Sequence, residues 1–379
     1  MYNRKSNTQN RKSKHFLLPV CLSLSMFYSK MKVKQIIHSI FAISFLFASC
    51  AEKDDCCPIP GADYSKGIFV VNEGPFGGAG TISWHNPDTG ETQDSLFEKA
   101  NNGAVLGQFV QSLTFFNGKG YIVVNGANRV VVVDAKTFKF LDTIGGLALP
   151  RYFLPLDNNT AYVSQWGLDG LTGTVAKIDL NTNTIVKTIP AGHGPEKMVL
   201  ANDRVYVANS GGYGKDSTLT EILLSNDVPQ ILALPAGINP ASFVWNNYQS
   251  AAKLFYICKG YYLDPVQEGL LDYLASGGPG IKIPPYSDDI VLDHDSGDMY
   301  FIGANNVYKV TKGAHSFVIS TLFSQDAYGL GLDAEQNLLY CADAKGFMSA
   351  GEVVIYKTDG TKVGAFRAGV GPGEVVIVK

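Results

Sequence analysis

The stretch RVYVANSG, residues 204–211, decides the fold of this chain. One aromatic residue stands among small and β-branched residues, and Asn-Ser-Gly follows, which predicts a short strand that ends in a turn. The phrase recurs at intervals of about 40–50 residues, a period typical of β-propellers and solenoids. Its seven aromatic residues are Phe69, Tyr121, Tyr162, Tyr206, Tyr256, Tyr300 and Tyr340.

Each repeat predicts four strands. Around Tyr162 they are expected at residues 161–164, 173–179, 185–189 and 197–200, with Asn, Asp and Gly turns between them. Alternating apolar residues interrupted by such turns are typical of an antiparallel blade. A turn that contains Pro195 precedes the last of these strands. We expect the strand after this turn to be the innermost one of its blade and to line a central channel.

The two ends of the repeat region predict how the ring closes. The first phrase begins at Ile68 without an inner strand before it, and the chain ends in GPGEVVIVK, residues 371–379, which reads as an inner strand. Pairing of these two segments removes an open sheet edge. The sequence therefore predicts an all-β, seven-bladed β-propeller over residues 67–379, closed by pairing of the C-terminal inner strand with the N-terminal blade.

The first 49 residues are predicted to be a leader and a lipoprotein signal peptide. From Met31, which we expect to be the true start, Lys32 and Lys34 precede an apolar run of about 12 residues, and small residues then lead to Cys50. A run of this length is too short to span a bilayer, which needs about 20 residues. We expect Cys50 to carry the lipid and residues 50–66 to form a tether.

Charge and cysteine content narrow the class of protein further. Eight of the 31 basic residues and none of the 34 acidic ones lie in residues 1–49, so the remaining chain is clearly acidic. An acidic body disfavours nucleic acid as a partner. Cysteines are too sparse for a disulfide framework, and Cys258 and Cys341 are predicted to be small core residues because they lie within strand repeats.

Catalytic motifs do not occur in the sequence: there is no GxSxG, HExxH, CxxC or phosphate-binding loop. The run DHDSGD, residues 293–298, is similar to a calcium loop but lacks its full spacing and its terminal Glu. Because it falls where a blade turns between its inner and second strands, we expect Asx turns there. No catalytic residue, no metal ligand and no cofactor is predicted.

Two sets of loops are expected on one face of the ring: those after each repeated phrase and those before each inner strand. They are rich in aromatic and amide side chains, which suit a large, rigid ligand with polar groups at its edge. Any single Asn there has the alternative role of forming a turn. The predicted ligand-binding residues are Phe76, Asn128, Arg151, Tyr152, Trp166, His193, Tyr213, Lys259, Tyr261, Tyr262, Tyr286 and Tyr328.

The phrases VYVANSG, KIDLNTNTIVKTIPAGHGPEKMVL and GEVVIYKTDGTKVG resemble the repeats of the YncE-like β-propellers. Together with the lipoprotein leader and the acidic stretch after Cys50, the chain is similar to the cobalamin-capturing, BtuG-type surface lipoproteins of Bacteroidetes. That acidic stretch has the alternative of being a solvated linker. The resemblance covers residues 67–379 and its motifs are specific for the fold.

The resemblance implies a lipid-anchored outer-membrane protein that faces the cell exterior. Such a protein would bind cobalamin or another corrinoid, as a transported ligand and not as a cofactor, and would hand it to an outer-membrane transporter. Two alternatives stay open at this point. One is a surface propeller that binds glycan or protein through an exposed aromatic patch, and the other is a propeller hydrolase or lactonase with carboxylate metal ligands at the channel.

Overall fold

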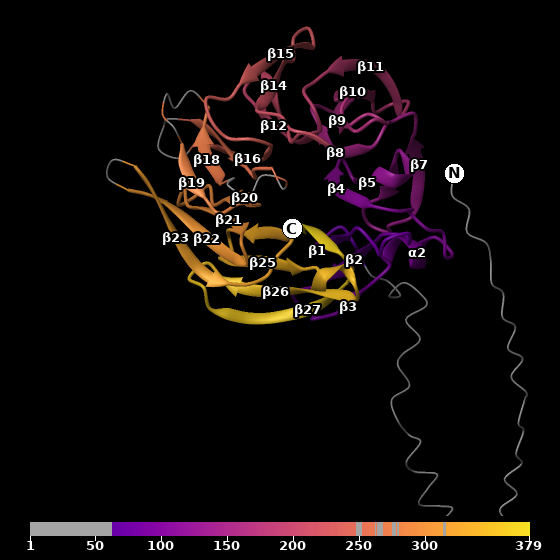
Figure 1. The fold of residues 1–379 in the computed structure, drawn as a ribbon. Coiled ribbons are helices and arrows are strands. Elements are labelled where there is room, and N and C mark those ends of the chain that lie inside the picture. The colour runs from indigo at the N-terminus through magenta and orange to yellow at the C-terminus, as the bar shows by residue number, and fades with distance from the viewer. Residues whose placement is uncertain are drawn as a thin grey trace, which may run out of the picture. The chain divides into compact units, whose positions relative to one another are not determined.

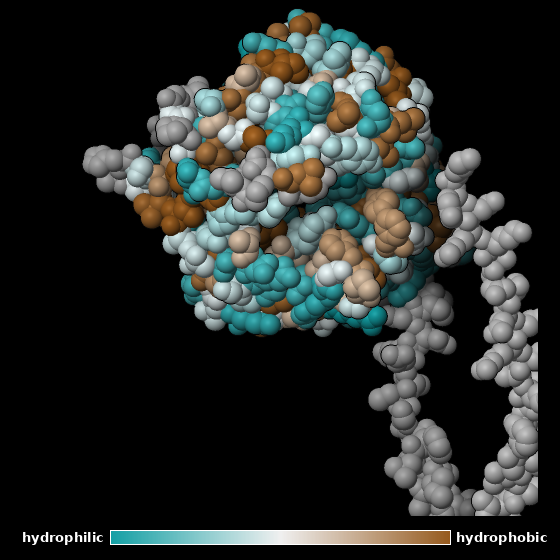
Figure 2. Space-filling model, in the orientation of Figure 1, coloured by the Kyte–Doolittle hydropathy of each residue, from teal (hydrophilic) through white to brown (hydrophobic). Residues whose placement is uncertain are grey.

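A computed structural model describes residues 63–247, 252–261, 263, 268–274, 278, 280–313 and 316–379. They form seven four-stranded antiparallel sheets arranged as blades in a ring (Figure 1), which confirms the predicted all-β, seven-bladed propeller. On the face seen in Figure 2, hydrophobic and hydrophilic residues are intermixed. The predicted signal peptide, Cys50 and most of the tether lie outside the described residues, so they stay predictions.

The strands of each blade follow from the innermost to the outermost, and we call them inner, second, third and outer strands. Blade 1 holds β28 (Pro372–Val378), β1 (Gly67–Asn72), β2 (Thr81–His85) and β3 (Thr92–Gln93); blade 2 holds β4 (Val110–Phe116), β5 (Lys119–Val124), β6 (Arg129–Asp134) and β7 (Phe140–Ile144). Blade 3 holds β8 (Pro150–Pro155), β9 (Thr160–Gln165), β10 (Thr174–Asp179) and β11 (Thr184–Pro190); blade 4 holds β12 (Pro195–Ala201), β13 (Arg204–Asn209), β14 (Thr218–Leu223) and β15 (Val228–Ala233). Blade 5 holds β16 (Pro240–Asn246), β17 (Lys253–Cys258), β18 (Gly269–Tyr273) and β19 (Ile281–Ile283); blade 6 holds β20 (Asp288–Leu292), β21 (Met299–Gly303), β22 (Asn306–Lys312) and β23 (Phe317–Ser324). Blade 7 holds β24 (Gly329–Asp333), β25 (Leu338–Asp343), β26 (Ala350–Lys357) and β27 (Lys362–Val370). Three short helical segments complete the described chain: α2 (Leu96–Ala100), η1 (Asn125–Ala127) and η3 (Lys345–Phe347).

The second strands are the most deeply buried elements, because each lies between the sheets of two neighbouring blades. The aromatic residue of every repeated phrase is buried on its second strand. Tyr121 on β5, for example, stacks on Phe153 of the next blade with ring centroids 4.2 Å apart. Burial on both faces explains why β5 and β6 are continuous apolar runs and not alternating ones. Cys258 and Cys341 are also buried in second strands, which confirms that they are core residues.

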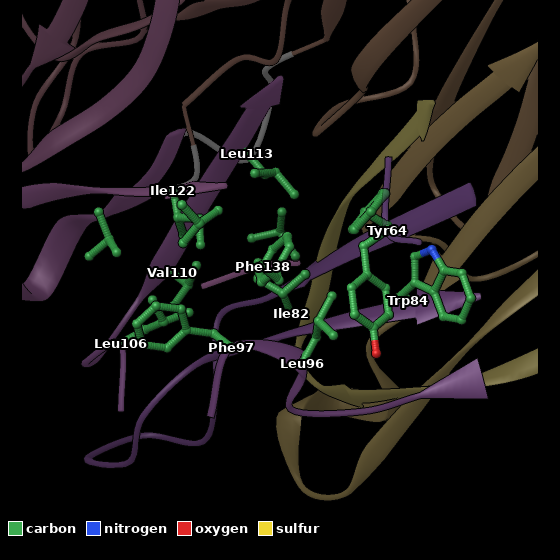
Figure 3. Close-up of a cluster of buried hydrophobic side chains, with 14 of the residues drawn as sticks. Tyr64, Ile82, Trp84, Leu96, Phe97, Leu106, Val110, Leu113, Ile122 and Phe138 are labelled. Atoms are coloured by element: carbon green, nitrogen blue, oxygen red, sulfur yellow. The ribbon is translucent and has the colours of Figure 1, made fainter. Parts of the chain in front are cut away.

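The core between blades 1 and 2 contains a helix in place of a long outer strand. Because β3 has only two residues, α2 follows it and buries Leu96 and Phe97 against the sheets. Figure 3 shows these side chains beside Ile82, with Tyr64 next to Trp84. The rings of Tyr64 and Trp84 meet edge to face at 5.0 Å, and the Tyr64 N–H donates to the Lys136 oxygen over 2.9 Å. The described chain therefore enters the ring beside the turn between β6 and β7.

The ring has two faces that carry different loops. We call the one with the loops after second strands and before inner strands the mouth face, and the other the opposite face. The turn of residues 293–298 lies on the opposite face, where Asp293 Oδ1 accepts the N–H groups of Asp295 at 2.9 Å and Ser296 at 3.3 Å. This confirms the expected Asx turn. Tyr64 also enters on the opposite face, because Lys136 lies in a turn between a third and an outer strand.

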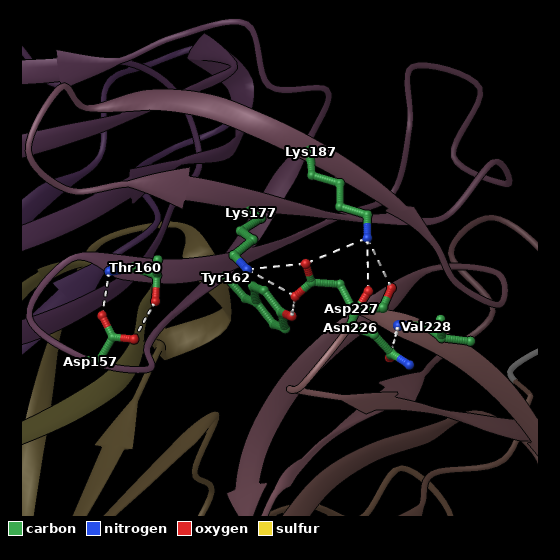
Figure 4. A network of polar contacts seen from close by, with 8 residues as sticks. All are labelled: Asp157, Thr160, Tyr162, Lys177, Lys187, Asn226, Asp227 and Val228. Carbon is green, nitrogen blue, oxygen red and sulfur yellow. Dashed lines mark hydrogen bonds and ion pairs between the residues drawn. The ribbon is translucent and has the colours of Figure 1, made fainter.

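Neighbouring blades are joined by a partly buried network of hydrogen bonds and ion pairs between blades 3 and 4 (Figure 4). The carboxylate of Asp227, in the turn before β15, accepts hydrogen bonds from Tyr162 at 2.5 Å and from Lys177 at 3.0 Å, and Lys187 lies 3.5 Å away. Burial alone would raise the pKa of Asp227, but the hydrogen bonds from Tyr162 and Lys177 and the lysine charges outweigh it and lower that pKa.

We expect Asp227→Asn to lower the free energy of unfolding by about 1–3 kcal/mol at pH 7, because it leaves buried donors without a charged acceptor. Since the pKa of Asp227 is lowered in the folded state, this stabilisation is present above the unfolded pKa of about 4 and is lost as the pH falls through the folded pKa. Urea unfolding at pH 7 and at pH 3 measures it. Lys187→Ala, which removes the more exposed lysine, should cost less, and an equal loss at both pH values would contradict the assignment.

The ring closes where β28 pairs with β1. The register runs from Gly67 opposite Val378 to Asn72 opposite Pro372, so the last strand of the chain is the inner strand of the first blade. It also contacts the neighbouring inner strands β24 and β4. The predicted closure by the C-terminal strand is confirmed.

Deletion of residues 372–379 should lower the melting temperature by at least about 10 °C, because it removes a whole inner strand and exposes the edge of β1. Lys379→Ala is the matched control, since it keeps β28 and removes only partly exposed ion pairs with Asp333 and Glu335. Differential scanning calorimetry compares the two. A deletion that melts within two or three degrees of the control would show that β28 does not close the ring.

Candidate functional site

A cavity of about 490 Å³ opens at the mouth face, where the channel begins. Every blade contributes to its wall. The residues that line it are Val71, Glu73, Val110, Gln111, Arg151, Tyr152, Glu196, Ala241, Lys259, Tyr286, Asp288, Asp289, Ile302, Gly303, Ala304, Asn305, Asn306, Gln325, Ala327, Tyr328 and Gly373. Its volume is within the range of small-molecule sites, and polar groups converge in it from separate strands.

The wall is built from the first residues of the inner strands. Six of the seven inner strands have a register shift there, which inserts one extra residue against the second strand. Side chains of successive residues normally point to opposite faces of a strand, but a β-bulge changes their direction. In this way Arg151 and Tyr152 both line the cavity, as do Asp288 and Asp289.

Arg151 is fixed between a carboxylate and an aromatic ring. Its Nε lies 3.0 and 3.1 Å from the two Glu196 oxygens, and its guanidinium lies over the Trp166 ring at 4.4 Å. Trp166 in turn meets Tyr213 edge to face at 5.7 Å. A bidentate ion pair with a stacked ring holds a guanidinium in one orientation. These side-chain contacts therefore link Glu196 in the cavity wall, through Arg151 and Trp166, to Tyr213 at the exposed rim.

A second ion pair joins the inner strands β12 and β20. The Lys197 ammonium contacts the Asp289 carboxylate, and Asp289 also accepts the N–H of Leu330 over 3.1 Å. The two charges come from blades 4 and 6, and Ala241 of the intervening blade 5 lines the same cavity as Asp289. Burial alone would lower the pKa of Lys197, but the negative charge of Asp289 outweighs it and keeps the ammonium protonated.

Two further carboxyl groups at the mouth have neutral partners. Glu73 accepts the hydroxyl of Tyr328 at 2.9 Å, and burial raises its pKa despite this hydrogen bond. Glu374 accepts the N–H of Leu113 at 2.8 Å. Burial raises the pKa of Glu374 to about 7, although this hydrogen bond and the charge of Lys197 lower it. Near neutral pH the Glu374 carboxyl group is therefore close to its protonation point.

Glu374→Gln should stabilise the protein more at pH 8 than at pH 5. The folded protein holds an extra proton between the unfolded pKa of about 4.3 and the folded pKa of about 7, so wild-type stability falls as the pH rises through this window. The amide oxygen still accepts the Leu113 N–H but carries no charge. Urea unfolding at both pH values measures the trend, with the exposed Glu335→Gln as control. A difference that does not vary with pH would contradict the raised pKa.

Five of the predicted ligand-binding residues line the cavity: Arg151, Tyr152, Lys259, Tyr286 and Tyr328. Phe76, Trp166, His193, Tyr213 and Tyr261 lie in loops of the mouth face outside the cavity wall. Asn128 forms a turn, since it has a left-handed backbone (φ 53°) and its Oδ1 accepts the N–H of Leu149 at 2.8 Å. Tyr262 lies outside the described residues.

The predicted set did not include several charged groups at the mouth. Glu73, Glu196, Asp288 and Asp289 line the cavity, Lys197 on β12 contacts Asp289, and Glu374 on β28 follows the lining residue Gly373. A signal was present in the sequence, because charged residues follow the turn in PEK at 195–197, in SDD at 287–289 and in GPGE at 371–374. If side chains alternated strictly between the two faces of each strand, only one of two successive residues, such as Asp288 and Asp289, would face the channel.

Within the described residues, no group of three or more His, Cys, Asp or Glu side chains is arranged to hold a metal ion. In the same part of the chain there is no helix with the length and hydrophobicity needed to cross a membrane.

The fold and the site together define a seven-bladed β-propeller with a polar cavity at the mouth of its channel. The sequence profile of a domain of unknown function, DUF5074, matches residues 66–227. Among curated proteins, none matches the chain significantly.

Solved structures with a similar fold include proteins of different activities. A quinonprotein alcohol dehydrogenase-like protein from Bacteroides thetaiotaomicron is 15% identical, with 84% of this chain and 80% of that chain covered and a TM-score of 0.62. The periplasmic gluconolactonase of Pseudomonas aeruginosa is 11% identical, with 83% and 99% covered and a TM-score of 0.57. The dihydro-heme d1 dehydrogenase NirN, in complex with DHE, is 14% identical, with 88% and 78% covered and a TM-score of 0.51. At these identities the likeness shows the fold alone.

Proposed function

We propose that this protein binds a small molecule at the mouth of its channel, and that the ligand is cobalamin or another corrinoid. The observation that supports this best is the polar cavity, lined from all seven blades and bordered by exposed aromatic side chains. A corrin is a broad ring with amide arms. The arms match the acceptors and donors of Glu73, Asn305 and Gln111, and the ring faces match aromatic side chains such as Tyr286.

The charge arrangement supports a ligand of this kind. Arg151 is paired with Glu196, and Lys197 is paired with Asp289. In each pair the positive and the negative charge neutralise one another. A neutral, amide-rich ligand then meets oriented hydrogen-bonding groups without having to compensate a large net charge. We expect its affinity to depend little on salt concentration.

The proposal also includes the location of the protein in the cell. A lipid on Cys50 would hold the protein at the outer membrane, facing the cell exterior, and the captured ligand would pass to an outer-membrane transporter. The described chain enters the ring at Tyr64, on the face opposite the mouth. A propeller also serves dihydro-heme d1 dehydrogenase, whose name refers to a tetrapyrrole comparable in size to a corrin.

A surface that binds glycan or protein is the second candidate. The observation that favours it is the exposure of Tyr213, Tyr286 and Tyr328 around the mouth, since exposed aromatic side chains serve such surfaces. A lactonase has the support of the fold shared with the gluconolactonase of Pseudomonas aeruginosa. Binding of glycan fragments or hydrolysis of gluconolactone by the purified protein would favour these two candidates respectively.

The direct test is calorimetric titration of cyanocobalamin into the purified mature chain. We expect one site per protein, with an affinity that Trp166→Ala weakens by at least about 1 kcal/mol, roughly fivefold, because Arg151 loses the ring that orients it. Trp166→Phe keeps a ring beneath the guanidinium and should retain most of the affinity. Phe140→Ala, on the outer strand β7, should change nothing. Absence of heat at micromolar protein and ligand would overturn the corrinoid proposal.

A further inference from the structure

The mouth face carries the most exposed large hydrophobic side chains of the described residues. Phe76 is 97% exposed and Met348 is 89% exposed. Phe76 lies in the loop between β1 and β2, and Met348 directly follows η3, in the loop between β25 and β26. Exposed apolar side chains of this size are costly in water, and a contiguous group of them marks an interaction site.

Phe76 and Met348 lie on loops of the neighbouring blades 1 and 7, and we call the set Phe76, Tyr328, Phe347 and Met348 the shelf. The Tyr328 and Phe347 rings meet edge to face at 5.0 Å. Phe347 packs so closely on Gly371 that a Cβ at Gly371 would lie 2.8 Å from its ring. Gly371 is bound to the loop that carries Phe76, because its oxygen accepts the N–H of Glu73 at 2.8 Å.

The loop that carries Phe76 has a fixed base and an open tip. A Cβ at Gly74 would lie 2.5 Å from the Ala79 oxygen, and one at Gly80 would lie 2.5 Å from the Asn72 oxygen, so the base is closely packed. At the tip, Gly77 has a φ of 80° and nothing within 4 Å of a Cβ. The geometry thus presents Phe76 on an unobstructed turn above a rigid support.

The shelf is continuous with the cavity. Tyr328 lines the cavity wall while its ring contacts Phe347. Its hydroxyl donates to Glu73, which also lines the wall, at 2.9 Å. A polar pocket and an apolar surface therefore meet at Tyr328, without another element between them.

We infer that the shelf is a second subsite, which takes the flat apolar face of a ligand whose polar groups occupy the cavity. This inference rests on the proposed function, that the mouth binds a small molecule. A cavity of about 490 Å³ cannot enclose a macrocycle with side arms. A ligand confined to the cavity would leave Phe76 and Met348 in water, whereas a macrocycle that projects from it would cover both. The ligand class is therefore an amphiphilic ring compound wider than the cavity, with an apolar face and a polar edge.

The test combines Phe76→Ala and Met348→Ala in the mature chain and uses cyanocobalamin and coproporphyrin III as probes. Both side chains are exposed, so the double variant should melt within about 2 °C of wild type. We expect its affinity for the macrocycle that wild type binds to fall at least about fivefold. Matched controls are Phe140→Ala and Val186→Ala, which remove exposed apolar side chains from outer strands and should leave the affinity unchanged.

The remaining outcomes separate the shelf from the proposed function. If wild type and the double variant bind a probe equally well, the shelf is not a subsite, while the proposed function stands. If wild type binds neither probe at about 100 μM, the ligand class and the corrinoid proposal are both wrong. A second copy of this chain is the alternative occupant of the shelf, and sedimentation of wild type and double variant tests for it. A wild-type dimer that the double variant abolishes would make the shelf a self-association surface and overturn the inference.

Discussion

Pairing of β28 with β1 is the interaction on which the rest of the structure depends. It joins the two ends of the described ring, so each inner strand has an inner strand packed on both sides and the edge of β1 is covered by β28. The mouth is a product of the same closure. Glu73 meets Tyr328 across 255 positions of the chain, and Glu374 meets the backbone of Leu113 across 261 positions. Without closure, neither carboxyl group would have its partner.

The second constraint is the extra residue at the head of six inner strands. A regular strand would send one side chain of each successive pair into the packing between blades, and the charged residues of this chain would then be buried without partners. The bulge lets both Arg151 and Tyr152 reach the channel, and it does the same for Asp288 and Asp289. The polar character of the mouth thus follows from a local backbone irregularity repeated around the ring.

This repetition explains what the sequence could and could not predict. The phrase around Tyr206 predicted a strand that the structure has as β13, and GPGEVVIVK predicted the closing strand, because periodicity and turn residues are local properties. The contact of Lys197 with Asp289 joins residues 92 positions apart on blades 4 and 6, and no local sequence pattern predicts it. Asn128 shows the converse, since its residue type suits a ligand but its backbone conformation assigns it to a turn.

The charges of the mouth bear on which ligands it can distinguish. The paired groups cannot turn toward a ligand without breaking a buried ion pair, so they act as fixed walls. Glu73 and Glu374 are different, because their partners are a hydroxyl and a backbone N–H and burial raises the pKa of both. Because the pKa of Glu374 is raised to about 7, its carboxyl group can accept or donate a hydrogen bond near neutral pH at a small cost in free energy. The proposed function would bring amide groups to this carboxyl group, and an amide offers both a donor and an acceptor for either of its protonation states.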